Sequence, residues 1–403
     1  MKRKIALLTQ WFDPEPTFKG LLFAKGLLKE GFEVTVITGY PNYPSGNLYP
    51  GYKIKLFKKE IIHGVNVIRL PLYPSHSRSI VGRIFNYLSF GFSSIIYTIF
   101  FMPKVDVLYG YHPPLTIGIT LSFVSIFRKI PIVYDIQDIW PDSLKATGMF
   151  SSNMGLSLID RLCNWVYSNA NIITVLSPGF KEKLINKGVE ENKIHIIYNW
   201  CNEELIIKKR YVKPVSFKTI EQKIILFAGN LGPAQSLKKI ILAFKSVETT
   251  FFHLVIIGTG IELDNLRELK NRESLSNVTF LPPVKMKEIG DYLNYADLLL
   301  VHLKNDPLFE ITIPSKIQAY LAIGKPLIVG VRGDSTNLIK KSNSGITFEP
   351  DNTKDFLRAL REYKNLNKKT INKLSYNSKL FYKNNMAFNI GVKKFSKLFN
   401  DLL

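Results

Sequence analysis

Residues 224–237 read IILFAGNLGPAQSL, and this stretch decides the fold expected for the second half of the chain. A short apolar run without alternation is typical of a strand buried on both faces, as in a parallel sheet. Two glycines follow the run, where they let the backbone approach a bulky anion closely. The pattern predicts a strand, a ligand-binding loop with Gly229, Asn230 and Gln235, and then a helix. A tight turn without a ligand is the alternative.

The same alternation of apolar runs and amphipathic stretches continues in both directions along the chain. It predicts parallel sheets in βαβ units, and therefore an α/β fold with two Rossmann-like, doubly wound domains. A second glycine loop begins at Gly258. We expect strands at residues 5–8, 34–38, 65–70, 105–109, 130–134, 172–176, 194–198, 224–228, 253–257, 278–281, 298–301, 327–331 and 346–348.

The length of 403 residues also favours two domains, because a single core stops growing near about 250–300 residues. The stretch 203–222 is charged and broken by Pro214, as a linker would be. We therefore predict an N-terminal domain of residues 1–202 and a C-terminal domain of residues 203–386, which face a ligand-binding cleft between them. A helix at about 387–403 is expected to pack back on the N-terminal domain.

The composition indicates an anionic partner, with a charge that serves solubility alone as the alternative. The chain carries 54 basic and 32 acidic side chains, a formal charge of +22. Nucleic acid, an anionic membrane surface and a phosphorylated substrate are the three classes that such a charge attracts. Two cysteines exclude a disulfide framework or a four-cysteine zinc site. The start of the chain lacks the long apolar run of a signal peptide, so we expect a cytoplasmic protein.

Residues 84–103, IFNYLSFGFSSIIYTIFFMP, are free of charge and long enough as a helix to cross a bilayer. The polar residues within the stretch and the strand expected directly after it argue against a spanning helix. We interpret it as a helix in the interface of an anionic membrane, with a buried core helix as the alternative. The membrane contacts predicted by this interpretation are Arg78, Arg83, Phe85, Phe90 and Phe92.

Residues 306–326, DPLFEITIPSKIQAYLAIGKP, carry the densest set of binding groups. Pro314 fits the first turn of a helix and leaves the amides of Ser315 and Lys316 at its positive end, where an anion binds. Glu310 and Gln318 offer a carboxylate and an amide suited to sugar hydroxyls. This stretch predicts a site for a phosphate-bearing small molecule. In the first half, Gly20 opens a helix that could hold a phosphate in the same way.

The motif around Glu310 and Gln318, followed by Ala322-Ile323-Gly324-Lys325-Pro326, resembles the E-x7-E region of retaining glycosyltransferase family 4. The stretches PNYPSGNLYPGYK (41–53), HGVNVIRLPLYP (63–74), DIQDIWPDS (135–143) and IIYNWCN (196–202) extend the resemblance along nearly the whole chain. They are most similar to a branch of O-antigen and capsule transferases that includes N-acetyl-L-fucosamine transferases.

The resemblance implies a GT-B fold, no metal requirement, and no cofactor apart from a nucleotide-sugar donor, most often a UDP-sugar. In this family pattern Glu310 contacts the donor sugar, Gln318 the ribose, and Ser315 and Lys316 the diphosphate. The loop with Gly229, Asn230 and Gln235 lies beneath the diphosphate, with Gly258 in the same layer. Gly20 occupies a glycine loop in the first domain, and His112 and Asp138 lie on the acceptor side.

Some positions depart from the family pattern. Asn230 and Gln235 stand where an arginine and a lysine are usual, and Tyr111 stands where many relatives have a histidine. The charge of the diphosphate would then be met by Lys316, by helix dipoles and by Lys19. Because a charge-assisted hydrogen bond is worth roughly 1.5–3 kcal/mol and a neutral one about 0.5–1.5, Lys316 is the strongest candidate.

The resemblance implies a retaining glycosyltransferase of surface polysaccharide biosynthesis, which moves an N-acetylated deoxyamino sugar from a nucleotide-diphosphate donor. With the basic charge and the interfacial helix, it predicts a polyprenyl-diphosphate-linked sugar acceptor at the cytoplasmic face of the inner membrane. A GT-B nucleotide-sugar epimerase shares the architecture and the diphosphate site and is the enzymatic alternative. A nucleic-acid-binding protein is the non-enzymatic alternative. It is disfavoured because the basic residues are dispersed and are not interleaved with stacking aromatics.

Overall fold

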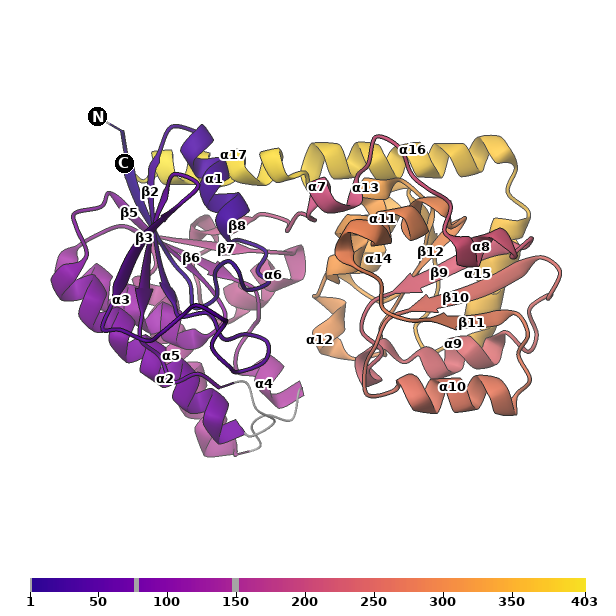
Figure 1. Ribbon diagram of the computed structural model, residues 1–403, viewed down its shortest axis with the longest axis horizontal. Coiled ribbons are helices and arrows are strands. Elements are labelled where there is room, and N and C mark those ends of the chain that lie inside the picture. Colours follow the sequence, from indigo (N-terminus) through magenta and orange to yellow (C-terminus); the bar gives the residue numbers. More distant parts are fainter. Residues whose placement is uncertain (1, 76–79, 147–151) are drawn as a thin grey trace. The chain divides into compact units, whose positions relative to one another are not determined.

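The computed structural model describes the chain except residues 1, 76–79 and 147–151 (Figure 1). The chain divides into two compact units. One consists of Met1–Tyr198 and Gly391–Leu403, and the other of Asn199–Ile390. Each unit is built around its own sheet.

The described residues of the first unit form an eight-stranded sheet with the order β3-β4-β2-β1-β5-β6-β7-β8. Its strands run parallel except for the antiparallel edge pair of β3 and β4. Later strands are added on both sides of β1, which makes the sheet doubly wound. The strands are β1 (Lys4–Leu8), β2 (Glu33–Gly39), β3 (Lys58–Ile62), β4 (Val65–Leu70), β5 (Val107–Tyr111), β6 (Ile132–Ile136), β7 (Ile172–Val175) and β8 (Ile194–Ile196).

The second unit holds a six-stranded, fully parallel sheet with the order β11-β10-β9-β12-β13-β14 in its described residues. Strands are again added on both sides of the first one. They are β9 (Lys223–Ala228), β10 (Phe252–Ile257), β11 (Val278–Leu281), β12 (Leu298–His302), β13 (Leu327–Gly330) and β14 (Gly345–Thr347).

Helices cover both faces of each sheet (Figure 1). The helices and helical turns of the two units follow in chain order. In the first unit they are α1 (Leu21–Lys29), α2 (Ile80–Ile96), the π-helix η1 (Tyr97–Phe101), α3 (Leu115–Arg128), α4 (Asp142–Ala146), α5 (Asn153–Asn169), α6 (Pro178–Asn186), the 3₁₀ turn η2 (Glu191–Lys193) and α17 (Phe388–Asp401), which begins in the second unit. In the second unit they are α7 (Glu203–Ile206), α8 (Val215–Lys218), the 3₁₀ turn η3 (Pro233–Gln235), α9 (Leu237–Ala243), α10 (Leu263–Arg272), α11 (Met286–Tyr295), α12 (Pro307–Glu310), α13 (Ser315–Ile323), α14 (Asp334–Ser342), α15 (Thr353–Lys364) and α16 (Lys368–Asn385).

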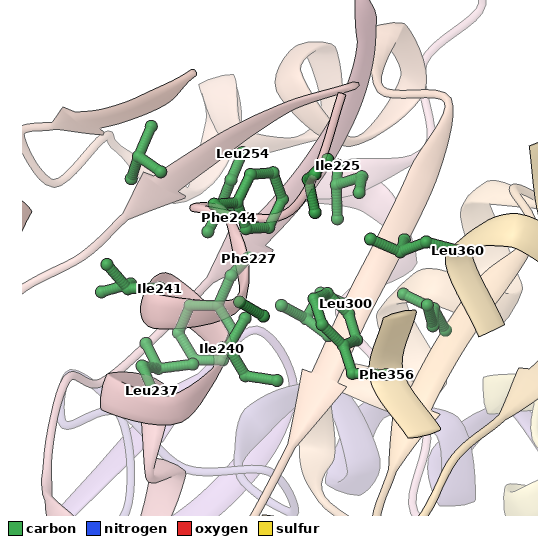
Figure 2. Close-up of a cluster of buried hydrophobic side chains, with 14 of the residues drawn as sticks. Ile225, Phe227, Leu237, Ile240, Ile241, Phe244, Leu254, Leu300, Phe356 and Leu360 are labelled. Carbon is green, nitrogen blue, oxygen red and sulfur yellow. The ribbon is translucent and has the colours of Figure 1, made fainter. Parts of the chain in front are cut away.

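The burial of the strands explains their composition. Every residue of β5, β6, β10 and β12 is buried, because helices cover both faces of these strands. In the second unit, Phe227 and Leu300 of the sheet pack with Ile240 of α9 and Phe356 of α15 (Figure 2). This core fixes the carboxyl ends of β9 and β12, from which the site described below is built.

The C-terminal helix α17 contributes to the core of the first unit. The ring of Phe395 lies 5.1 Å from that of Phe23 in α1 and 5.6 Å from that of Tyr109 in β5, measured between centroids. The ring of Phe399 lies 6.1 Å from that of Phe32. Aromatic burial therefore ties the end of the chain to the helix that follows its first strand.

The predicted fold class, two doubly wound α/β sheets in a GT-B arrangement, is confirmed. Each predicted strand is found, starting within two residues of its expected position. The antiparallel strand β3 was not predicted. It lies at the edge of the sheet with its residues only partly buried, and it mixes three charged residues with two isoleucines, so it lacks an apolar run.

Candidate functional site

Two glycine loops at the carboxyl ends of β9 and β10 lie directly against each other. A Cβ atom on Gly258 would lie 1.8 Å from the carbonyl oxygen of Gly229, and one on Gly260 would lie 2.2 Å from that of Leu231. The two positions have φ angles of +154° and +159°, which favour glycine. The Leu231 amide donates to the Thr259 carbonyl at 2.8 Å. The glycines thus allow backbone to pack on backbone and form one fixed layer.

Asn230 and Gln235, two predicted donor contacts, hydrogen-bond within the first of these loops. The Gln235 side-chain oxygen accepts from the Gly232 amide at 3.0 Å and from the Asn230 side-chain amide at 3.4 Å. Gln235 therefore holds the loop in shape, a role that the sequence did not indicate.

Lys316 lies beside this loop, in the first turn of α13. Its Nζ atom is 3.5 Å from the centroid of the Phe227 ring and 3.2 Å from the place that a Cβ atom on Gly229 would occupy. The Nζ atom is shielded from solvent and has no hydrogen-bond partner within the described ranges of the chain. Burial lowers the pKa of Lys316 to about 7.

The surroundings of Lys316 favour the binding of an anion. A buried cation is normally paired, because desolvation without compensation is costly. The cation–π contact with Phe227 compensates only part of that cost. The amides at the start of α13 add positive potential, since no side chain in the described part of the chain caps this helix. A phosphate group fits this combination of a lysine, a helix start and a glycine turn.

Tyr320, on the same helix, ties α13 to the end of β9. The Ala228 amide donates to its hydroxyl at 3.0 Å, and the hydroxyl lies 3.4 Å from the Ala228 carbonyl oxygen. Ser315 is exposed at the start of the helix. The contact between Tyr320 and Ala228 therefore fixes α13, which carries Lys316, against the strand that leads into the glycine loop.

Gln318 is buried and turned toward the start of its own helix. With its amide oriented to satisfy its neighbours, the side-chain nitrogen donates to the carbonyls of Pro314 at 2.9 Å and Ser315 at 2.7 Å. The sequence predicted a ribose contact here. In the structure, the amide nitrogen is used by the first turn of α13.

Glu310 ends the short helix α12 and is about half exposed. Its Oε1 lies 3.9 Å from Nη1 of Arg332, which also pairs with Glu349. A Cβ atom on Gly333, whose φ is +66°, would lie 2.0 Å from the Glu310 carbonyl oxygen. The backbone of Glu310 is thus held closely, while its carboxylate reaches the surface.

The first unit corrects two expectations about anion binding. The carboxylate of Asp13 accepts from the Leu21 amide at 2.6 Å, so an acidic side chain already fills the start of α1 behind Gly20. A Cβ atom on Gly20 would lie 2.3 Å from this carboxylate, so glycine is needed for this internal cap. Lys19 was expected near the diphosphate, but it is fully buried and forms an ion pair with Asp135.

His112 and Asp138 follow β5 and β6. His112 is 2% exposed, and burial lowers its pKa to about 3, so its ring stays neutral at ordinary pH. The ring lies edge-on to Tyr134 and Trp140. Asp138 reaches solvent, although the protein around it raises the pKa of its carboxyl by desolvation. A neutral imidazole carries no positive charge, so His112 offers one hydrogen-bond donor and one acceptor.

The predicted membrane residues do not all face the same way. Phe85 and Phe92 are 59% and 69% exposed on α2, whereas Phe90 is completely buried, which corrects its assignment. Phe90 shares a buried stripe with Asn86 and Ser94, spaced four residues apart along one side of the helix. Arg83 is partly buried, and Arg78 lies outside the described residues.

The exposed aromatic surface continues beyond α2. Phe100 and Phe101 of η1 are 74% and 59% exposed. Both lie in the charge-free stretch 84–103, but they were not among the predicted membrane contacts. Within the described ranges, the stretch Val81–Phe101 is the one helix long and apolar enough to cross a membrane by length and composition, and 33% of its most apolar window is buried.

Two contributors to the site were missed in the sequence. Phe227 lies under the Lys316 ammonium group. The feature of the sequence that could have indicated it is its position as an aromatic residue two places before the glycine loop. His302 is a buried histidine that ends the aliphatic strand β12, and it contacts the backbone of the same loop. Within the described ranges, no group of three or more histidine, cysteine, aspartate or glutamate residues is arranged to hold a metal.

The two parts of the chain match two family models. Residues 21–200 match the glycosyl transferase 4-like domain, and residues 210–381 match the model for glycosyl transferases group 1. Together the two matches span most of the chain.

Curated relatives carry names from polysaccharide biosynthesis. WcaI of Escherichia coli strain K12, named for a glycosyl transferase of colanic acid biosynthesis, is 25% identical over 75% of this chain and 76% of its own length. TuaH of Bacillus subtilis strain 168, named for a glycosyltransferase of teichuronic acid biosynthesis, is 25% identical over 58% of this chain and 59% of its own.

Solved structures share the fold at low sequence identity. The Anabaena protein HepE in complex with UDP has a TM-score of 0.71 at 14% identity and covers 100% of both chains. A trehalose-6-phosphate protein of Escherichia coli bound with UDP-2-fluoro glucose has a TM-score of 0.74 at 11% identity, with 99% of both chains covered. These likenesses show the fold, which is GT-B. The two domain matches, over residues 21–200 and 210–381, show the family: the chain belongs to the family 4 glycosyltransferases.

Proposed function

We propose that the protein transfers a sugar, with retention of anomeric configuration, from a nucleotide-diphosphate donor to a lipid-linked glycan acceptor during the biosynthesis of a surface polysaccharide. The observation that carries this proposal is the buried Lys316 ammonium group, which lies against the glycine loop without a hydrogen-bond partner in the described part of the chain. A diphosphate supplies the anion that this group lacks.

The chemistry requires stabilisation of the leaving diphosphate. The bond between the sugar C1 and the oxygen of the donor β-phosphate breaks, and a bond between C1 and the acceptor oxygen forms on the same face. The proton of the acceptor hydroxyl passes to the departing phosphate. Positive charge fixed beside that phosphate stabilises the transition state more than the ground state, because negative charge develops there as the bond breaks. Lys316 and the amides of α13 supply it, so we expect transfer without a divalent metal.

The donor is proposed to be a UDP-sugar, and within that class an N-acetylated deoxyamino sugar. Support for UDP comes from HepE and from the Escherichia coli trehalose-6-phosphate protein, whose structures contain UDP or a UDP-sugar. Support for the deoxyamino sugar comes from the sequence resemblance alone. Glu310, with its fixed backbone and surface carboxylate, is the group proposed to orient the donor sugar.

The acceptor is proposed to be a polyprenyl-diphosphate-linked sugar at the cytoplasmic face of the inner membrane. The exposed aromatic residues of α2 and η1 would enter the interface, while the net charge of +22 would favour anionic lipid. Flotation with vesicles tests this surface. We expect binding to vesicles that contain anionic phospholipid and weaker binding to neutral ones, and equal binding to both would contradict electrostatic docking.

A donor screen followed by a transfer assay tests the reaction. A ligand that binds only the folded state raises the melting temperature, so UDP and UDP-N-acetyl sugars should raise it more than ADP or GDP counterparts. The preferred donor should then give a new glycolipid only when a polyprenyl-diphosphate-linked sugar is present, with or without a metal chelator. A changed nucleotide sugar formed from the donor alone would favour the epimerase alternative.

A further inference from the structure

We propose that His302 positions the donor loop and that this loop is held only while the imidazole is neutral. The inference rests on the proposed function, because it concerns the loop beside Lys316. His302 does not need to touch the donor. It acts through the backbone of residues 229–235.

The hydrogen bonds of His302 define its protonation state. Its ring is completely buried at the end of β12, where its Nε2 atom lies 3.1 Å from the Asp351 amide nitrogen. Its Nδ1 atom lies 2.8 Å from the Gln235 carbonyl oxygen. A backbone amide can only donate and a carbonyl oxygen can only accept, so Nε2 must be the acceptor and Nδ1 must carry the proton. These two partners are satisfied together only by the neutral Nδ1–H tautomer.

The hydrogen bond between His302 and the Gln235 carbonyl connects the buried ring to the hydrogen bonds inside the glycine loop. The Gln235 backbone is held by His302, while the Gln235 side chain accepts from the Gly232 amide and the Asn230 side chain. Neighbouring residues of the loop are anchored to the same region, since the Lys304 amide donates to the Ala234 carbonyl at 2.9 Å. Any release at His302 is therefore transmitted to the glycine loop that lies against Lys316.

Asp351 fixes the other side of the ring. Its carboxylate accepts from the Ser236 hydroxyl at 2.5 Å and from the Asn305 amide at 3.0 Å. The ring of His302 also stacks on Phe348, with centroids 5.7 Å apart and planes 6° from parallel. The imidazole thus cannot turn to find other partners when its protonation changes.

Protonation of His302 places two hydrogen-bond donors, Nε2–H and the Asp351 amide, opposite each other. A proton on Nε2 would face the Asp351 amide hydrogen, and the bond between them would be lost. Lys239 and Lys316 are the nearby cations that disfavour this proton, and the Asp351 carboxylate favours it. Burial lowers the pKa of His302 below its usual value, so the loop should loosen only under acidic conditions.

Two variants test separately the two hydrogen bonds of the His302 ring, one with Gln235 and one with Asp351. In His302→Asn the side-chain nitrogen replaces Nδ1 and keeps the bond to Gln235. In His302→Gln the side chain reaches the position of Nε2 and keeps only the contact with Asp351. His253→Asn is the matched control, because His253 is also a strand histidine of the second unit but contacts Thr279 and not the loop.

Hydrogen exchange of the peptide that covers residues 229–236, without any ligand, is the first readout. We expect faster exchange in His302→Gln than in His302→Asn, and faster exchange in the wild type when the pH is lowered, after correction for the intrinsic rate. The second readout is UDP affinity at pH 8, where His302→Gln should bind about five- to tenfold more weakly than His302→Asn, the loss expected for one neutral hydrogen bond. Melting temperatures of both variants identify a general loss of folding.

The outcomes distinguish this proposal from the proposed function. UDP itself titrates near about pH 6, so the acid response is read as the difference between the wild type and each variant at the same pH. The wild type and His253→Asn should lose more UDP affinity in acid than His302→Asn does. Parallel losses in all three, or equal exchange in the two His302 variants, would overturn the role of His302. A wild type that binds no nucleotide while its loop responds as expected would overturn the proposed function alone.

Discussion

At the scale of single residues, the structure separates lysines that stabilise the fold from the lysine that is available to a ligand. Lys19 is buried, the Nζ atom of Lys316 is shielded from solvent, and desolvation lowers the pKa of each lysine. Lys19 is paired with Asp135, which also accepts from Tyr109 at 2.5 Å. Lys316 has no such acceptor among the described residues. The sequence shows a lysine in both places and cannot show its partner, because Asp135 lies more than a hundred residues from Lys19.

Binding of a diphosphate should be coupled to proton uptake by Lys316. With its pKa lowered to about 7, this lysine is mostly neutral at pH 8 in the free protein. A bound diphosphate favours the charged form, so the complex takes up close to one proton, and donor affinity falls as the pH rises above about 7. Calorimetric titration with UDP at pH 8, in buffers of different ionisation enthalpy, measures this number. The same uptake in Lys316→Met would contradict the assignment.

The ion pair of Lys19 should be a stability determinant. Removal of one partner leaves an uncompensated charge in the core, so Lys19→Met should lower the free energy of unfolding by about 3–5 kcal/mol. Equilibrium denaturation measures the change. The control is Lys245→Met, which breaks an ion pair with Glu273 at the surface and should leave the free energy of unfolding close to that of the wild type. Equal shifts in the two variants would argue against the buried pair.

At the scale of elements, α2 shows which part of a helix a sequence can predict. Its apolar character and its length are plain in the sequence, and the exposure of Phe85 and Phe92 agrees with the predicted interfacial face. The burial of Phe90 was missed because phenylalanines occur on both sides of the helix, and only the packing partner decides which one is covered. In the structure that partner includes α3, where Thr120 bonds Ser94 at 2.9 Å.

The exposed face of α2 and η1 should determine membrane affinity. Phe92→Asp combined with Phe100→Asp places two charges among side chains proposed to enter the interface, so binding to anionic vesicles should fall about tenfold or more. Flotation measures the effect. Ile261→Asp, at a residue of the second unit that is 79% exposed, is the matched control and should bind as the wild type does. Unchanged flotation of the double variant would exclude this face.

At the scale of the whole molecule, the fold was predictable because it depends on patterns that are local in the sequence. Apolar runs predict the strands. Glycines at the ends of these runs predict the loop between β9 and α9 and the loop after β10. The edge strand β3 was missed because it is charged and only partly buried. The interior of the site could not be predicted, because the hydrogen bonds of Gln235 with Gly232 and of His302 with Gln235 depend on how the loops close. The same holds in the first unit for the hydrogen bond between the Leu21 amide and the Asp13 carboxylate.

The central claim is that Lys316 supplies the charge that binds a nucleotide diphosphate. Calorimetric titration of UDP into the wild type, Lys316→Met and Lys325→Met at neutral pH tests it most directly, since Lys325 is a partly buried lysine just beyond the other end of α13. We predict that Lys316→Met binds UDP about 10- to 100-fold more weakly, the loss expected for a charge-assisted hydrogen bond, while its melting temperature is maintained and Lys325→Met binds as the wild type does. Wild-type affinity in a folded Lys316→Met protein would contradict the claim.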